Sequence, residues 1–162
     1  MKKVLSLLLV LGLCFGLAGC GGDDSGSDDK KTEQKEEKKD TYAVGETAEV
    51  EGIKITVNST RVDEGIVPAN EGKQYFVMDI SLENTKDDEF SSSSILCYEL
   101  KDGEGRKAEM SVAANLNGNL DTTVAPGEKA AGEIAFETAI EGELVLKFTP
   151  SIGSDSVKIK VR

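Results

Sequence analysis

The sequence predicts an all-β protein whose folded part is a single antiparallel sandwich. From Thr41 to Arg162 the chain consists of short segments in which apolar and polar residues alternate, separated by Gly, Pro, Asn and Asp. This period of two is typical of strands with one buried face. No stretch shows the apolar spacing of an amphipathic helix, and only one cysteine, Cys97, lies in this part. A disulfide framework is therefore excluded there, and burial of apolar side chains has to stabilise the domain.

The N-terminal stretch has the pattern of a lipoprotein signal peptide. Met1-Lys2-Lys3 supplies positive charge, the run from Val4 to Leu17 is apolar, and Leu17-Ala18-Gly19-Cys20 forms a cleavage junction. As a helix the apolar run spans only ~21 Å, short of the ~30 Å hydrocarbon core of a bilayer. We expect residues 1–19 to be removed and the thiol of Cys20 to carry a diacylglycerol. Two acyl chains anchor a protein stably, so the predicted location is the outer, extracytoplasmic face of the cell membrane.

Residues 20–40 follow as the lipidated cysteine and a polar tether. The segment from Gly21 to Asp40 contains Gly, Ser, Asp, Lys and Glu but no Val, Ile, Leu, Phe, Met or Tyr. It cannot bury enough apolar surface to offset its ordering entropy, so we expect a disordered spacer. The third segment, residues 41–162, is the predicted sandwich domain.

The first half of the domain shows the clearest strands. Ala48–Val50 and Ile53–Val57 flank Glu51-Gly52, which predicts a hairpin. The strongest strand is expected at Gln74–Asn84, where the even positions should face the core: Phe76, Met78, Ile80 and Leu82.

The second half continues the pattern with one ambiguous stretch. Leu96, Tyr98 and Leu100 form a further row expected to point inward, and a turn follows at Asp102–Gly105, where both glycines are free to adopt positive φ. Ala108–Asp121 is compatible with a strand, a helical turn or a loop. Pro126-Gly127 predicts a turn, after which three strands are expected, at Gly132–Phe136, Leu144–Phe148 and Val157–Val161.

Together these segments give about seven or eight strands in the 122 residues from Thr41 to Arg162, which suits one immunoglobulin-like sandwich. The order and spacing of several motifs carry a family resemblance. These motifs are Tyr42–Glu46, Gly72–Asn84, Pro126–Glu128, Gly132–Phe136 and Leu144–Pro150. The domain resembles the domain of unknown function 4352 family, immunoglobulin-like domains found in surface lipoproteins of Gram-positive bacteria. The resemblance implies the sandwich fold and a surface location, and it brings no activity, cofactor or catalytic residue.

Composition excludes several kinds of active site. The sequence has no His, so Ser-His-Asp triads, Cys-His pairs and His-containing metal sites are excluded. Cys97 lies in the apolar stretch Ile95–Tyr98 without a neighbouring Lys or Arg, which favours a buried structural thiol. None of the 22 acidic residues from Thr41 to Arg162 lies in a recognisable catalytic motif. We expect no catalytic residue, no cofactor and no resident metal.

Two segments invite a calcium hypothesis. In Asn115–Asp121 oxygen-bearing side chains recur at every second position, as in calcium loops, but Gly118 and Pro126 do not match an EF-hand. Asp87-Asp88-Glu89 is the second candidate, and a polar hairpin tip is the simpler interpretation.

Charge and anchoring together predict the class of function. With 22 acidic and 12 basic residues, the domain has a net charge of −10, which opposes binding to nucleic acid. We expect a non-enzymatic binding module that contacts a protein, peptide or envelope polymer through loops or a strand edge. The alternatives are a carboxylate-dependent envelope hydrolase and a calcium-binding surface module.

Overall fold

The computed structural model describes residues 39–162, which contain eleven strands and one helical turn. The signal peptide, Cys20 and nearly all of the tether predicted from the sequence lie outside the described residues. Seven of the strands have four or more residues, which matches the expected seven or eight, and four are shorter. The elements are β1 Tyr42–Ala43, β2 Thr47–Val50, β3 Ile53–Asp63, β4 Lys73–Asn84, β5 Phe90–Ser92, α1 Ser94–Cys97, β6 Tyr98–Asp102, β7 Glu109–Ser111, β8 Thr122–Val124, β9 Lys129–Ala139, β10 Leu144–Phe148 and β11 Val157–Lys160.

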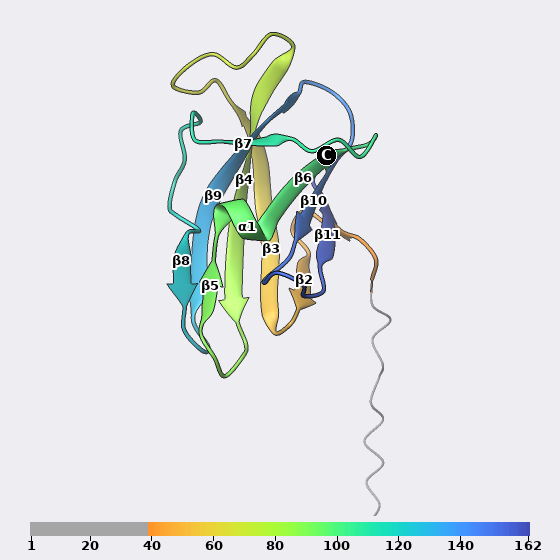
Figure 1. Cartoon of the computed structure of the whole chain (residues 1–162). Coiled ribbons are helices and arrows are strands. Elements are labelled where there is room, and N and C mark those ends of the chain that lie inside the picture. The colour runs from red at the N-terminus through yellow and green to blue at the C-terminus, as the bar shows by residue number, and fades with distance from the viewer. Residues whose placement is uncertain (1–38) are drawn as a thin grey trace, which may run out of the picture. The chain divides into compact units, whose positions relative to one another are not determined.

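Two sheets form the sandwich that the alternation predicts (Figure 1). One sheet has the order β1-β11-β10-β6 and the other has the order β2-β3-β4-β9-β7, while β5 and β8 form a separate two-stranded ribbon. All pairs are antiparallel except β1 with β11, where Tyr42 lies opposite Ile159 in a parallel register. The predicted antiparallel sandwich is confirmed, and β1 adds one short parallel pair at this edge because it enters beside β11.

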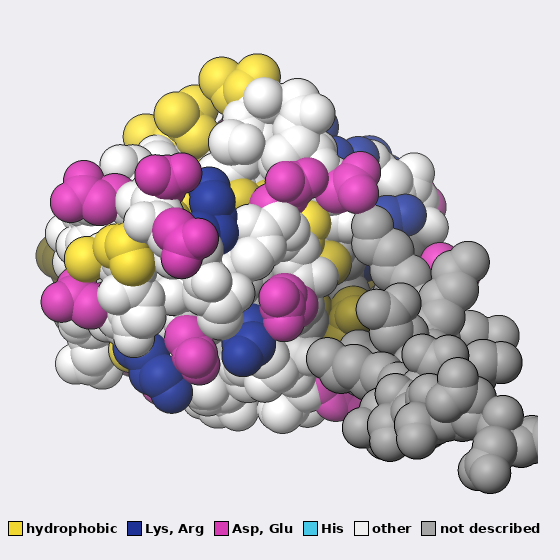
Figure 2. All heavy atoms as spheres, turned by 90° about the horizontal axis from the view of Figure 1, so that it is seen from below, with side chains coloured by type: hydrophobic (Ala, Val, Ile, Leu, Met, Phe, Trp, Pro, Cys, Tyr) yellow, Lys and Arg dark blue, Asp and Glu magenta, His cyan; other side chains and the backbone are white. Residues whose placement is uncertain are grey.

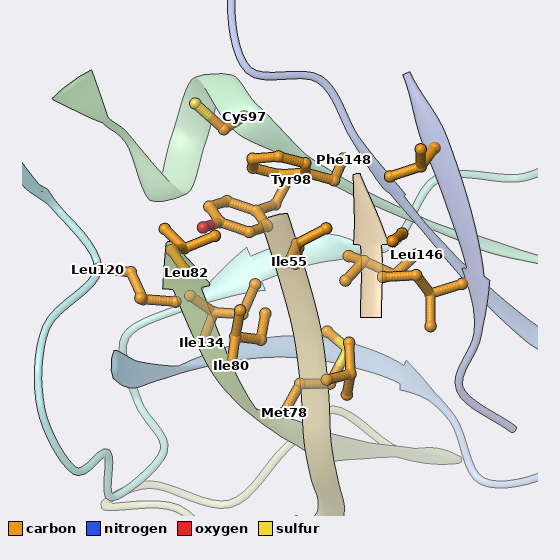
Figure 3. Close-up of a cluster of buried hydrophobic side chains, with 14 of the residues drawn as sticks. Ile55, Met78, Ile80, Leu82, Cys97, Tyr98, Leu120, Ile134, Leu146 and Phe148 are labelled. Carbon is orange, nitrogen blue, oxygen red and sulfur yellow. The ribbon is translucent and has the colours of Figure 1, made fainter. Parts of the chain in front are cut away.

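The main core lies between the two sheets. The predicted inward row of β4 is confirmed, since the side chains of Phe76, Met78, Ile80 and Leu82 are at most 4% exposed. Figure 3 shows side chains of this row together with residues from the facing sheet, including Phe148, which is fully buried. The ring of Phe148 packs edge-on against Phe90, with 6.3 Å between centroids, and in a tilted arrangement against Tyr98, with 5.3 Å between centroids. Aromatic contacts of this kind add to the stabilisation from burial.

The opposite face of β4 is also buried over part of its length. Tyr75 and Val77 form a second small cluster with Ala114 and Ala135. Ala69 in the β3–β4 loop packs against them, and so does the loop between β7 and β8, residues 112–121, here called the covering loop. This loop resolves the ambiguous stretch Ala108–Asp121: β7 occupies three of its residues and most of the remainder is the covering loop.

One local expectation fails for an identifiable reason. Leu96 does not point inward but is 67% exposed, because the chain forms one helical turn at α1, closed by the Cys97 N–H donating to the Ser93 carbonyl at 2.9 Å. Tyr98 and Leu100, which follow in β6, are buried as predicted. In the β6–β7 turn only Gly105 adopts positive φ, at 82°, so Gly103 does not require a glycine for its conformation.

Candidate functional site

An open groove of about 460 Å³ lies at one end of the sandwich. Its walls come from the start of β4, the β6–β7 connection, the start of β7, and the end of β9 with its turn into β10. In Figure 1 these connections lie together at the upper end of the domain. Loop clusters at the end of a sandwich are a common position for binding sites, because the sheets hold them rigidly.

Charged side chains dominate the groove, and most of them are paired within the protein. The Asp102 carboxylate accepts hydrogen bonds from the side chain and the backbone N–H of Arg106, at 2.8 and 2.9 Å, and this lowers the pKa of Asp102. Arg106 also pairs with Glu104, and Glu143 accepts a hydrogen bond from Lys160 at 2.6 Å. These groups are therefore committed to internal contacts.

Three charged groups in the groove have no hydrogen-bond or ion-pair partner among residues 39–162: the carboxylates of Glu109 and Glu141 and the ammonium of Lys73. All three side chains are exposed. Because they remain available to an incoming molecule, they are the groups through which the groove can contact a charged partner.

The C-terminal residue fixes one wall of this groove. The guanidinium of Arg162 donates hydrogen bonds to the carbonyls of Ala139, Ile140 and Gly142, at 2.7 to 3.1 Å. It also lies over the ring of Phe76, 5.4 Å from the centroid. Arg162 thereby holds the β9–β10 turn against the core.

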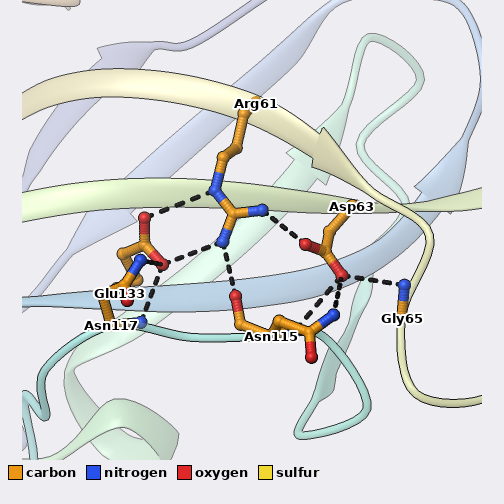
Figure 4. A network of polar contacts seen from close by, with 6 residues as sticks. All are labelled: Arg61, Asp63, Gly65, Asn115, Asn117 and Glu133. Carbon is orange, nitrogen blue, oxygen red and sulfur yellow. Dashed lines mark hydrogen bonds and ion pairs between the residues drawn. The ribbon is translucent and has the colours of Figure 1, made fainter.

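A second cluster of polar side chains lies on the outer face of the five-stranded sheet (Figure 4). Arg61 on β3 donates to Asp63 at 2.5 Å and to Glu133 on β9 at 2.9 Å. It also donates to the Asn115 carbonyl in the covering loop at 2.5 Å. Asn117 completes the cluster, since its backbone N–H donates to Glu133 at 2.9 Å. This clamp fixes the covering loop to the sheet.

Electrostatics within the clamp keep all three charged groups ionised. Hydrogen bonds from Arg61 lower the pKa of both Asp63 and Glu133, and those carboxylates raise the pKa of Arg61 in turn. The Asp63 and Glu133 side chains are only 11% and 10% exposed, so neither is open to a ligand. The clamp is structural, and it contains no group poised to transfer a proton.

In Asn115–Asp121, the first calcium candidate, the oxygen-bearing side chains form hydrogen bonds with different partners. The Asn115 amide donates to Asp63 at 3.0 Å, the Asn119 side chain accepts from the Asp121 N–H at 2.8 Å, and the Asp121 carboxylate accepts from the Ser94 hydroxyl at 2.8 Å. Asp87-Asp88-Glu89, the second candidate, is an exposed stretch between β4 and β5. Among residues 39–162 no three His, Cys, Asp or Glu side chains form a group suited to a metal ion.

The two cysteines singled out in the sequence are Cys97, which the structure describes, and Cys20, which it does not. Cys97 is buried, and this burial raises the pKa of its thiol, as expected of a structural cysteine. Cys20, the predicted lipidation site, lies outside the described residues. No helix within the described part is both long and apolar enough to cross a bilayer.

Comparison with known proteins identifies the family. The profile of the domain of unknown function DUF4352 matches residues 42–159, which is nearly the whole sandwich. The chain belongs to the DUF4352 family. This confirms the resemblance seen in the sequence motifs. No curated protein matches the chain in sequence.

Solved structures similar to this DUF4352 chain share its fold. The yjhA protein of Bacillus subtilis aligns with a TM-score of 0.60 and 14% identity, covering 75% of this chain and 99% of that one. An uncharacterized β-sandwich protein from Clostridium difficile 630 aligns with a TM-score of 0.53 and 20% identity, covering 80% of this chain and 99% of that one. A putative lipoprotein, ycdA of B. subtilis, aligns with a TM-score of 0.55 and 15% identity, covering 71% of this chain and 38% of that one. At these identities the likeness shows the β-sandwich fold alone.

Proposed function

We propose that this DUF4352 protein is a lipid-anchored, non-enzymatic binding module on the outer face of the cell membrane, and that its end groove contacts a cationic partner. The lipid is carried by Cys20. The partner is a protein, a peptide or an envelope polymer that presents ammonium or guanidinium groups to the groove.

The observation that carries this proposal is the set of free charges in the groove. Among residues 39–162, Glu109 and Glu141 have no partner, whereas the neighbouring Asp102, Glu104 and Glu143 do. The domain's net charge of −10 adds a long-range attraction that speeds the approach of a cation.

The descriptions of similar proteins are compatible with a location on the outer face of the cell membrane. One of the similar structures is described as a putative lipoprotein and another as a secreted protein of Mycobacterium tuberculosis. The descriptions of these similar proteins name no enzymatic activity.

A binding experiment with hexalysine as the probe tests the groove. The paired substitution Glu109→Gln/Glu141→Gln removes the two free carboxylates, whereas Glu49→Gln/Glu51→Gln removes two exposed carboxylates around the β2–β3 turn. Figure 2 shows the end of the domain that contains this turn, where acidic and basic side chains are intermixed. Both variants change the net charge equally, so the second is the matched control.

We expect calorimetric titration to show binding that weakens as salt rises and that is lost only in the groove variant. Equal losses in both variants would show that the bulk field alone attracts the probe, and would refute the groove as the contact site. A screen against peptides, glycans and esters should show no turnover. Turnover abolished by one Asp or Glu substitution would favour the envelope-hydrolase alternative.

A further inference from the structure

The strand β3 is longer than its neighbour β2 and leaves part of its edge open. β2 pairs with residues Ile53 to Thr56, and the Gly45 N–H adds one hydrogen bond to the Val57 carbonyl at 2.8 Å. From Ser59 to Asp63, β3 is paired with β4 on one side only. Within residues 39–162, no hydrogen bond outside the β3–β4 ladder uses a backbone atom of Ser59–Asp63.

The other long strand edges of the described domain are covered. The edge of β6 is closed by residues 106–108, with the Ala108 N–H donating to the Leu100 carbonyl at 2.9 Å. Beyond β7, the edge of β9 is closed by the covering loop, where the Glu133 N–H donates to the Asn117 carbonyl at 2.9 Å. The outer strands β1, β2 and β7 have two, four and three residues. The five residues Ser59–Asp63 are thus the longest open edge, here called the β3 edge.

This edge lacks the usual protection against pairing with another chain. Exposed edges are commonly blocked by Lys, Pro or a bulge within the strand. The β3 edge contains neither Lys nor Pro, and its bulge lies before it, at Asn58 between Val57 and Ser59. The one basic residue, Arg61, is neutralised by Asp63 and Glu133 on the outer face.

An apolar side chain lies beside the open backbone. Val62 pairs with Phe76 in the ladder, so it lies on the core side of the sheet, yet it is 58% exposed. Thr60 lies on the same side and is partly buried. A strand added at this edge would cover Val62 with one of its own side chains while its backbone pairs with β3.

We infer that the β3 edge is a docking site for an extended segment of another polypeptide, which adds to the sheet as a short strand. The open backbone groups supply hydrogen bonds, and a span of about five residues covers ~17 Å. Specificity comes from an apolar residue placed against Val62 and from Lys or Arg residues nearby, since the domain is acidic. This site is separate from the end groove and does not depend on the groove binding a cation.

The test uses hydrogen exchange on the mature chain with a defined probe. The probe is an acetylated and amidated peptide of alternating Val and Lys, nine residues long, and its control is the same peptide with alternate backbone nitrogens methylated. Methylation removes the donors needed for strand pairing and leaves the charges unchanged. We expect the unmodified peptide to slow exchange at amides within Ser59–Asp63, and the methylated peptide to have no such effect.

Two protein variants sharpen this test. Val62→Lys places a charge beside the open edge, whereas Val112→Lys makes the same change at a residue of the covering loop that is 88% exposed. We expect Val62→Lys to weaken peptide binding about tenfold, the effect of ~1.4 kcal/mol, and Val112→Lys to leave it unchanged.

Each contrary result has a distinct meaning. Protection, without peptide, of those amides of Ser59–Asp63 that point away from β4 would show that the chain's own tether or a second copy occupies the edge, and would overturn the inference. Equal binding of the methylated peptide, or protection confined to the groove, would also overturn it. The groove variant Glu109→Gln/Glu141→Gln should leave the protection of Ser59–Asp63 intact, so the two proposals can fail separately.

Discussion

Gly132 in the middle of β9 is predicted to be the position where a single methyl group does the most damage to the covering loop. A Cβ at this residue would lie 2.8 Å from the nitrogen and 2.9 Å from the carbonyl carbon of Asn119. Both are backbone atoms, which cannot move aside as a flexible side chain does. Gly132→Ala therefore requires the loop to shift, which strains the Gly118–Gly132 bridge and the hydrogen bond from Glu133 to Asn117.

The expected cost follows from two opposing contributions. Overpacking of this kind typically destabilises by ~1–3 kcal/mol, whereas replacing Gly by Ala within a strand favours folding by roughly 0.5–1 kcal/mol. The net loss should be about 1–2 kcal/mol, measured by urea unfolding, with faster hydrogen exchange in the covering loop.

Gly103→Ala is the matched control for this substitution. Gly103 has no positive φ, and its Cβ would lie 3.6 Å from the Cβ of Glu143, an ordinary contact. We expect a change within about 0.5 kcal/mol. Equal stability of the Gly132→Ala and Gly103→Ala variants, with unchanged loop exchange, would refute the close approach of the loop to β9.

Three further predictions concern the clamp, the core and the anchor. Because the pKa values of Asp63 and Glu133 are lowered in the folded state, their contribution to stability is present above about pH 4 and is lost as pH falls further. Urea unfolding between pH 7 and 3 should show this loss of stability. The loss should be smaller in the Arg61→Met variant. Phe148→Ala should cost ~3–5 kcal/mol, since the ring is fully buried, and a loss below about 1 kcal/mol would contradict its place in the core. Cys20→Ser should release the protein from membranes or leave an uncleaved precursor, and wild-type protein in the aqueous phase of a detergent extraction would contradict lipidation.

The sequence predicts the main core well because that core depends on a local pattern. On β4 the even positions reach the core wherever the strand runs, so alternation alone identifies Phe76 and Ile80 as buried. Tyr75 and Val77 on the other face are buried as well, at 4% and 0% exposure, but only because loops pack over them: the covering loop and the β3–β4 loop at Ala69. The alternation of residues along a strand does not tell whether its second face is covered by a loop or open to water.

The polar clusters could not be predicted for a related reason. Arg61 and Asp63 are two residues apart on one strand and therefore share a face, which the sequence indicates. Their partner Glu133 lies 72 positions after Arg61. Its position within reach of Arg61 follows from the β3-β4-β9 strand order, in which the Arg61 side chain extends across β4. The same strand order decides which carboxylates are free: Glu133 is held by Arg61, whereas Glu109, on the neighbouring β7, has no partner in the described chain. In the sequence both are acidic residues in alternating segments, so the difference between a structural carboxylate and one open to a ligand arises only when distant segments come together in the folded sheet.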